Sequence, residues 1–316
     1  MKVIEHFEKA NKPLISFEII PPKRGGDMSS LLSIIDDLAQ FNPPFIDITS
    51  HAAEVIYEET PTGFQKKIKR KRPGTLGICA LIQNKYNIDA VPHILCRGFT
   101  REETEDLLIE LQYLGIDNVL AIRGDDSGYE KPILYGRSAN PYALELVQQI
   151  TDMNRGKYLE DNLLDAEPSN FCIGVAGYPE KHFESPNLRM DIQCMKAKAD
   201  AGADYVVTQM FFDNSAYFKF LEVSREEGLK VPIIPGLKIL TTKGNLSAVP
   251  RKFYVNIPEE LAKEVAAAKP EHVMEIGVNW AAKQVEELLN KGAPSLHFYI
   301  MQNSKPIMML MKKIKL

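Results

Sequence analysis

The segments Leu14-Ile-Ser-Phe-Glu-Ile-Ile20 and Asn118-Val-Leu-Ala-Ile-Arg-Gly-Asp125 carry the pattern that decides the fold. Each is a short apolar run with a polar or charged residue near the point where a strand would give way to a loop. The same pattern recurs in Phe45 to Thr49, Ala90 to Cys96, Phe171 to Tyr178, Tyr205 to Met210, Pro232 to Leu237 and Ser295 to Met301. Helix-like stretches separate nearly all of these runs. Eight strands alternating with helices predict an α/β fold, a parallel (β/α)8 TIM barrel.

The length of the chain is that of a single barrel domain, and its net charge favours small-molecule partners. A (β/α)8 barrel needs about 250 residues, and the chain has 316, of which 45% are hydrophobic. We therefore expect a single catalytic barrel over residues 1–316 and no regulatory domain. The formal charge of -4 disfavours a nucleic-acid or membrane-surface binder, since such proteins usually carry a basic excess. The sequence has no N-terminal apolar signal region and no run of about 18 apolar residues, so we expect a cytoplasmic protein.

Several common sites are not indicated. The four cysteines are scattered, with no C-x-x-C pair and no clustering with histidine, so neither a metal site nor a disulfide framework is expected. No G-x-G-x-x-G follows a strand, and the P-loop and G-x-S-x-G patterns do not occur. A Rossmann dinucleotide site, a P-loop and a serine-hydrolase elbow are therefore unsupported.

Strand periodicity singles out Glu18. In a strand, alternate residues share a face, so Ser16 and Glu18 lie together and opposite to the apolar Phe17. Glu18 should then point into the barrel near the carboxyl ends of the strands, where barrels keep their chemistry. Burial raises the pKa of a carboxyl group, which would let Glu18 act as a general acid near neutral pH. The alternative is an acid paired with a neighbouring Lys or Arg, and the pattern leaves both open.

The same rule gathers further polar residues at one mouth. Asp47 and Thr49 share a face of the second strand, and His93 and Gln209 lie toward the ends of later strands. We expect the mouth to collect Glu18, Thr49, His93, Asp125, Tyr178 and Gln209. The glycine in Arg123-Gly124-Asp125 would let a flat ring approach the backbone.

Capping patterns predict where three helices begin. Thr100 and Glu103 form a capping box for a helix over 101–114, and Asn140-Pro141 and Ser185-Pro186 each predict a cap followed by proline. In the helix after Ser185, helical spacing sets Asp191, Cys194 and Lys198 beside the core stripe, on a face that could meet a ligand. The segment 126–139 is too long for an ordinary connection and follows a strand, as functional barrel loops do.

Two other functions remain open from the residues alone. The basic run at 66–72 is compatible with a nucleic-acid binder, although the charged face of a solvated helix is the favoured interpretation. Lys238, just past the seventh strand, could serve as the Schiff-base lysine of an aldolase or lyase barrel.

The chain resembles the 5,10-methylenetetrahydrofolate reductases of the bacterial, catalytic-domain-only type over nearly its whole length. The matching motifs are Ser16-Phe-Glu-Ile-Ile-Pro-Pro22, Pro92-His93, Leu120-Ala-Ile-Arg-Gly-Asp125, Gly177-Tyr-Pro-Glu-Lys-His182, Asp200-Ala-Gly-Ala203, Thr208-Gln-Met-Phe-Phe-Asp213, Ile234-Pro-Gly-Leu237 and His297-Phe-Tyr299. The resemblance implies a (β/α)8 barrel that binds FAD without a Rossmann motif. It implies ping-pong hydride transfer from NADH, or less readily NADPH, through FAD to the folate, giving 5-methyltetrahydrofolate for methionine biosynthesis. It also implies small-molecule partners and a homo-oligomer.

By the same resemblance, Glu18 would protonate N10 of the folate, and Asp125 would lie near the flavin and the pterin. Gln209 would contact whichever substrate lies on the flavin face. The FAD contacts carried over are Thr49, His93, Arg123, Gly124, Asp125, Tyr142, Ala143, Tyr178, His182, Asp191 and Lys198.

Overall fold

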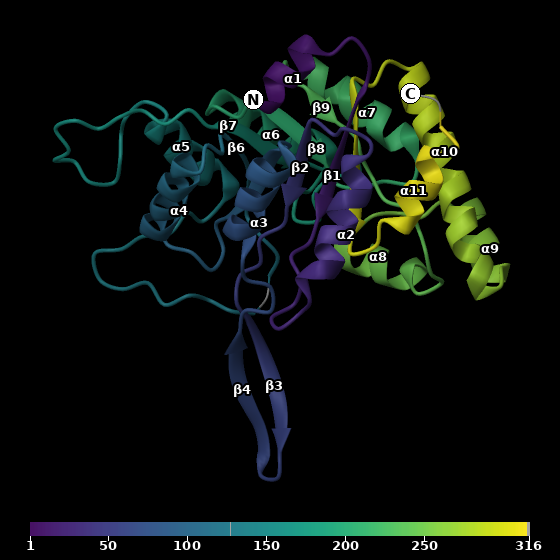
Figure 1. Ribbon diagram of the computed structural model, residues 1–316, viewed down its shortest axis with the longest axis horizontal. Coiled ribbons are helices and arrows are strands. Elements are labelled where there is room, and N and C mark those ends of the chain that lie inside the picture. Colours follow the sequence, from purple (N-terminus) through teal and green to yellow (C-terminus); the bar gives the residue numbers. More distant parts are fainter. Residues whose placement is uncertain (127, 315–316) are drawn as a thin grey trace.

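The strands form a nearly closed parallel barrel in the computed structural model, which describes residues 1–126 and 128–314 (Figure 1). The barrel strands are β1 (Leu14–Ile19), β2 (Phe45–Ile48), β5 (Asp89–Leu95), β6 (Asn118–Ile122), β7 (Cys172–Gly177), β8 (Tyr205–Thr208), β9 (Ile233–Ile234), β10 (Gly236–Leu237) and β11 (Ser295–Met301). Their order in the sheet is β10-β11-β1-β2-β5-β6-β7-β8-β9. Only Pro235 separates β9 from β10, so the two ends of this order belong to one run of chain. The predicted TIM barrel is confirmed.

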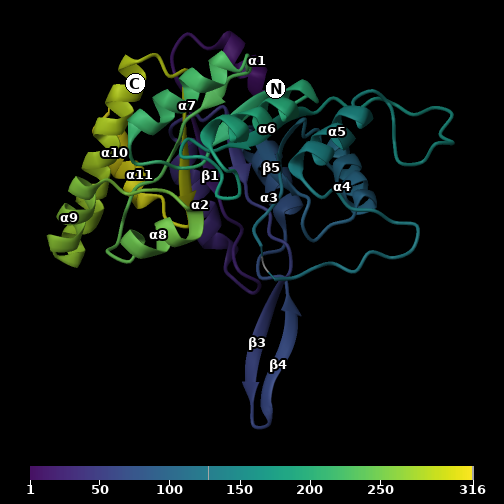
Figure 2. The ribbon, with the colours of Figure 1, turned by 180° about the vertical axis from the view of Figure 1, so that it is seen from behind.

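Helices cover the outside of the barrel (Figures 1 and 2). They are α1 (Val3–Lys9), α2 (Met28–Ala39), α3 (Thr75–Leu81), α4 (Arg101–Tyr113), α5 (Ala143–Met153), α6 (Leu188–Asp200), α7 (Asn214–Glu226), α8 (Asn245–Phe253), α9 (Glu259–Ala267), α10 (Val273–Asn290) and α11 (Lys305–Met311). Short π and 3₁₀ segments precede β5 (Ile82–Tyr86) and α10 (Pro270–His272). None of the helices described is both long and apolar enough to cross a bilayer.

The inside of the barrel is apolar at its amino-terminal end. Helix α1 lies there, and its Val3 is fully buried against Phe45, Val91 and Leu120 from the strands. The backbone N–H of Val3 donates to Asn118 Oδ1 at 2.8 Å, which ties the helix to the start of β6. Burial of these side chains removes apolar surface from water and closes this end. Polar chemistry is therefore left to the carboxyl ends of the strands.

One predicted helix start is confirmed, and two are wrong by two residues. Thr100 caps α4, since its Oγ1 accepts from Glu103 N at 3.2 Å and Glu103 Oε2 accepts from Thr100 N at 2.9 Å. Helix α5 begins at Ala143 because the Asn140 side chain donates instead to Gln149 Oε1 at 2.6 Å. Helix α6 begins at Leu188.

The start of α6 has the same kind of explanation. The Ser185 hydroxyl donates to Asp191 Oδ1 at 2.9 Å, so it does not cap the backbone. Asn187 takes the capping role, and its Oδ1 accepts from Met190 N at 2.9 Å. In both helices the predicted cap residue makes a side-chain bond that the sequence pattern does not reveal.

The basic run at 66–72 is not on a helix. Strands β3 (Glu54–Thr60) and β4 (Gly63–Lys69) pair as an antiparallel hairpin that projects from the barrel in both ribbon views (Figures 1 and 2). Pro61 and Thr62 make the turn, and Thr60 Oγ1 donates to Gly63 O at 2.8 Å. Helix was the wrong interpretation, because the turn residues and the β-branched and aromatic residues of Val55 to Tyr57 favour a hairpin.

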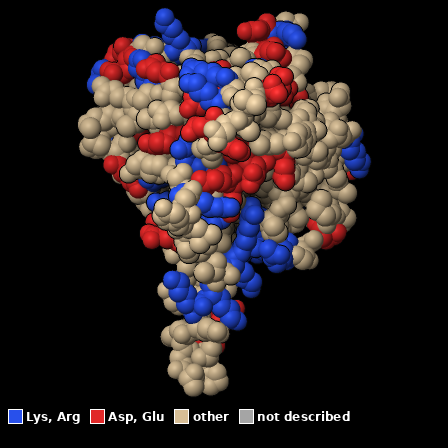
Figure 3. All heavy atoms as spheres, turned by 90° about the vertical axis from the view of Figure 1, so that its left-hand side faces the viewer, with Lys and Arg blue, Asp and Glu red and all other residues tan. Residues whose placement is uncertain are grey.

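The hairpin exposes several large apolar side chains on one face, beside Glu59 and Lys66. Residues paired across an antiparallel ribbon share a face, which puts Tyr57, Phe64 and Ile68 on one side, 60 to 75% exposed. On the other side Lys67 pairs with Glu58 at 2.5 Å. Basic side chains also gather where the hairpin meets the barrel (Figure 3). Arg72 donates there to Pro21 O at 2.5 Å, which anchors the hairpin beside the end of β1.

Candidate functional site

Glu18 lies inside the barrel near the carboxyl end of β1, as the strand periodicity predicts. Its neighbour Phe17 packs outward in the core between strands and helices, so Glu18 faces inward. The side chain is 8% exposed. In the sheet register Glu18 stands opposite Asp47 of β2 on one side and Tyr299 of β11 on the other. Two neighbouring strands therefore hold its position on both sides.

Glu18, His93 and Asp47 form a buried group of three polar side chains. His93 Nε2 lies 3.5 Å from Glu18 Oε2 and 3.6 Å from Asp47 Oδ2. Asp47 is fully buried and His93 is 5% exposed. Neither Asp47 oxygen has a hydrogen-bond partner within the described chain, which is unusual for a buried carboxyl. The imidazole thus lies within 3.6 Å of two largely buried carboxyl groups.

Burial sets the protonation of this group. It raises the pKa of Glu18 from the ordinary 4.5 to about 7, with His93 and Lys238 lowering it and Asp47 and Asp125 raising it. Burial also raises the pKa of Asp47 well above its ordinary value. It lowers the pKa of His93, against the opposing effect of Glu18. The carboxylic acids and the imidazole are therefore favoured in their neutral forms, so Glu18 can hold a proton near neutral pH.

The structure favours the first of the two sequence alternatives for Glu18. Among the described residues no Lys or Arg lies within ion-pair distance of its carboxyl, and His93 Nε2 is 3.5 Å away. Burial favours the protonated form, while the role of general acid stays a prediction.

A second polar layer lies beneath Glu18. Ser16 Oγ and His297 Nδ1 are 2.9 Å apart, and burial, with a smaller effect from His93, lowers the pKa of His297 to about 3. The Tyr299 hydroxyl donates to Thr208 O at 2.6 Å. A Cβ at Gly236 would meet the Tyr299 ring at 2.7 Å, so only glycine leaves space for that ring. This layer fixes the tyrosine beside Glu18.

Asp125 and Gln209 lie at the outer rim. Asp125 follows β6, is 86% exposed and stands 4.0 Å from Lys252. It is close enough to raise the pKa of Glu18, so the two predicted catalytic carboxyl groups do share one mouth. Gln209 follows β8, and its Oε1 accepts from the Met210 N–H at 3.0 Å.

Most of the predicted cofactor residues form a continuous patch beyond β6 and β7. The Arg123 guanidinium lies 5.8 Å from the Tyr142 ring, and the Tyr178 and His182 rings meet edge to face at 4.7 Å. The His182 N–H donates to Asp191 Oδ2 at 2.9 Å. The structure therefore brings these residues together, although their roles toward a cofactor stay predictions.

Lys198 completes this patch. Its ammonium donates to Ala176 O at 3.3 Å. Burial lowers the pKa of Lys198, and Asp191 raises it. Cys194, on the same helix, is exposed, while Ile192 and Met195 are buried in the core, as helical spacing predicts.

The remaining predicted residues lie between the patch and Glu18 or at its edge. Thr49 follows β2, and its Oγ1 is buried without a hydrogen-bond partner in the part of the chain described. Gly124 has φ +88°, which favours glycine. Ala143 is the first residue of α5.

Sequence reasoning left out two residues that contribute to the site. Asp47 shares a face with Thr49 by the alternation rule, yet nothing in the sequence shows that it contacts His93. Glu184 forms an ion pair with Arg123 at 2.8 Å, a contact between two loops that periodicity does not address. Within residues 1–126 and 128–314, no group of His, Cys, Asp and Glu is arranged to hold a metal ion.

Comparisons with family models and with known proteins indicate the same family. The family model described as methylenetetrahydrofolate reductase matches residues 2–315. Methylenetetrahydrofolate reductase 1 of Schizosaccharomyces pombe is 29% identical over 98% of this chain and 47% of its own length. The chain thus spans about half the length of such relatives. The 5,10-methylenetetrahydrofolate reductase of Salmonella typhimurium is 27% identical over 92% of this chain and 87% of its own length.

Solved structures show the same fold. An uncharacterized protein from Clostridium thermocellum, described as binding two copies of 5-methyl-5,6,7,8-tetrahydrofolic acid, superposes with a TM-score of 0.61. It is 14% identical and covers 98% of this chain and 97% of its own. An oxaloacetate acetylhydrolase superposes with a TM-score of 0.51 at 10% identity, over 98% of this chain and 83% of its own. At these identities the likeness concerns the fold alone.

The raised pKa of Glu18 predicts how the stability of the fold depends on pH. Because the folded pKa of about 7 lies above the ordinary 4.5, Glu18 costs no stability well below pH 4.5. Its ionisation in the unfolded chain then lowers the stability of the fold progressively between pH 4.5 and 7. The shift corresponds to about 3 kcal/mol of unfolding free energy. Urea unfolding at pH 5 and pH 8 should therefore show a smaller pH-dependent loss in Glu18→Gln than in the original protein. Equal losses in both proteins would contradict the assignment, and the exposed Glu260→Gln serves as control.

Proposed function

The chain belongs to the methylenetetrahydrofolate reductase family, and from this premise we propose that it reduces 5,10-methylenetetrahydrofolate to 5-methyltetrahydrofolate with FAD as cofactor. Reduced nicotinamide would supply the hydride, NADH more readily than NADPH, in a ping-pong sequence. The product would serve one-carbon metabolism and methionine biosynthesis. Cytoplasmic location and homo-oligomeric assembly stay predictions alongside this proposal.

The observation that carries the proposal is the buried Glu18 carboxyl. Opening the five-membered ring of the folate requires a proton on a ring nitrogen, taken in the proposal to be N10. Glu18 holds a proton near neutral pH because burial raises its pKa to about 7. It also faces the mouth of the barrel, where a substrate can reach it. A general acid is most effective when its pKa lies near the working pH.

The residues of the mouth fit a flavin dinucleotide. The Thr49 hydroxyl is a buried polar atom without a partner in the described structure, and it would bond to the edge of the flavin ring. Gly124 presents backbone without a side chain to a flat group. Lys198 and Arg123 supply positive charge for a diphosphate. When bound, FAD would take a hydride from the nicotinamide and give it to the folate.

The chain's own residues have separable tasks in this proposal. Glu18 delivers the proton and keeps the resulting carboxylate away from water. Asp125 lies at the rim, where its carboxylate would bond to the pterin, and Gln209 would contact either substrate. Because one mouth holds these groups, nicotinamide and folate would have to take turns there, which supports a ping-pong order. Relatives include a form named for NADH, from Arabidopsis thaliana, and a probable form named for NADPH, from Caenorhabditis elegans.

Neither alternative function gains support from an observation. The basic run at 66–72 lies on the hairpin and at its base, where Lys67 and Lys71 are paired with Glu58 and Glu54. Lys238 is half-buried beside the mouth, but no feature of the site points to a Schiff base rather than to another task.

Purified protein should be yellow with bound FAD, and the colour should bleach when NADH is added. Glu18→Gln should keep the flavin and its reduction by NADH, because the amide has the shape of the acid but no proton to give. Its reduction of methylenetetrahydrofolate should fall by at least about 100-fold. Stopped-flow absorbance follows the two half-reactions separately. An unimpaired folate half-reaction in this variant would refute the role of Glu18.

Lys198→Met should weaken FAD binding about tenfold or more, since a charge-assisted bond to phosphate is lost. The matched control is Lys196→Met, two residues earlier on α6, whose ammonium is bonded to Asp200 Oδ1 at 2.8 Å. Titration of the apoprotein with FAD, followed by flavin fluorescence, gives both dissociation constants. Equal affinities in the two variants would remove Lys198 from the cofactor site.

A further inference from the structure

Lys238 lies in line with Glu18 across three strands. Leu237 of β10 stands opposite Phe298 of β11, so Lys238 follows at the level of Tyr299. Tyr299 in turn stands opposite Glu18 of β1. Leu237 and Phe298 pack outward in the core, so the residues that follow them face the mouth. Glu18 and Lys238 therefore flank the same tyrosine on the inner side of the barrel.

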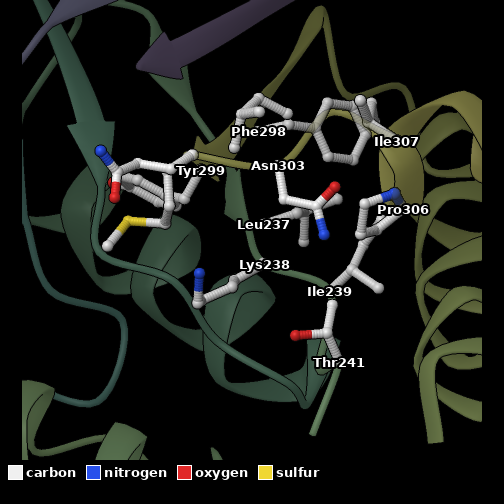
Figure 4. A pocket seen from close by; sticks show the side chains of 12 residues that line it. Leu237, Lys238, Ile239, Thr241, Phe298, Tyr299, Asn303, Pro306 and Ile307 are labelled. Atoms are coloured by element: carbon white, nitrogen blue, oxygen red, sulfur yellow. The ribbon is translucent and has the colours of Figure 1, made fainter. Parts of the chain in front are cut away.

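The Lys238 side chain is half-buried, and its ammonium is unpaired among the described residues. Its side chain lines a cavity of about 170 Å³ together with Tyr299, Thr241 and Asn303 (Figure 4). Within the described chain no hydrogen bond or ion pair is formed by its nitrogen. Burial lowers the pKa of Lys238, Glu18 raises it and Lys252 lowers it. A partly desolvated cation without a partner loses hydration that no bond replaces, and this cost is offset if the cation faces a charge that appears during the reaction.

The groups around Glu18 indicate that the charge served by Lys238 is the Glu18 carboxylate. His93, Asp47, Lys238 and Asp125 all act on the pKa of Glu18. The two aspartates oppose its ionisation. His93 favours the ionised form more strongly than Lys238 does, but burial favours the neutral imidazole, which carries no charge to attract a carboxylate. Lys238 is the lysine among these neighbours, and its positive charge favours the ionised form of Glu18. Glu18 is neutral before it reacts and negative afterwards, so the attraction is strongest after proton transfer.

We propose that Lys238 is a positioning residue for proton transfer, and that its ammonium stabilises the carboxylate that Glu18 becomes after it protonates the folate. The inference rests on the proposed function. In the step, the Glu18 O–H bond breaks as the N–H bond forms on N10, and the O–H electron pair stays on the Glu18 oxygen. The bond from the methylene carbon to N10 then breaks with its electron pair going to N10, and the iminium carbon left on N5 would accept the hydride of the proposed cycle. Lys238 forms no covalent bond, which separates this role from a Schiff base.

The test compares Lys238→Met and Lys238→Arg in the holoenzyme. The folate half-reaction is measured in single turnovers between pH 6 and pH 10, and reduction by NADH is measured in the same preparations. Lys243→Met is the matched control, since Lys243 lies in the next turn of chain but donates to Ala266 O at 2.7 Å. Unchanged reduction by NADH shows that each variant is folded and holds its flavin.

Lys238→Met should slow the folate half-reaction about tenfold and move its alkaline limb about one pH unit upward. The limb moves upward because removing a cation raises the pKa of Glu18. Lys238→Arg should stay within about threefold of the original rate. Folate affinity should change little.

Three results would overturn the inference. An unchanged rate and pH profile in Lys238→Met would show that the ammonium does not act on Glu18. A loss confined to folate affinity would make Lys238 a ligand for the substrate instead. Borohydride trapping of a carbonyl substrate on Lys238 would establish a Schiff base. A protein that binds no flavin or does not reduce the folate at all would refute the proposed function first, before any variant is compared.

Discussion

The desolvation of one carboxyl group is the constraint on which the site depends. Glu18 reaches the interior because β1 alternates apolar and polar residues, and because flanking strands hold it opposite Asp47 and Tyr299. Removing a carboxylate from water disfavours its charged form more than nearby charges favour it. The pKa of Glu18 is therefore raised to about 7, and the group becomes an acid suited to neutral pH.

The barrel supports this constraint by dividing its interior into two parts. At the amino-terminal end, Val3 of α1 and the apolar cluster around Phe45 exclude water. Toward the carboxyl ends lie the bonded pair of Ser16 and His297 and then the group of Glu18, His93 and Asp47. The apolar part stabilises the fold, and the polar part can then be kept for chemistry. The patch of predicted cofactor residues continues outward from the polar part beyond β6 and β7.

Alternation and spacing were sufficient to predict the barrel, its eight strand runs, the inward direction of Glu18 and the face of α6 that carries Asp191 and Lys198. These features repeat along the chain with a fixed period, so they are visible in sequence. The hairpin β3–β4 was missed because a lysine-rich run gives the same charge pattern on a strand as on a helix. The cap residues Asn140 and Ser185 were misassigned because their side chains donate to the side chains of Gln149 and Asp191 instead of capping the backbone. The contact of His93 with Asp47 depends on how β2 and β5 align with each other, and the sequence of neither strand alone gives that register.

The central claim is that burial keeps Glu18 protonated near neutral pH, and direct titration tests it best. Protein labelled with ¹³C at the glutamate carboxyl carbon would be titrated by NMR beside Glu18→Gln, which identifies the Glu18 resonance by its absence. The account predicts that this resonance titrates near pH 7, apart from those of exposed glutamates. A Glu18 resonance that titrates near the ordinary value of 4.5 would contradict it.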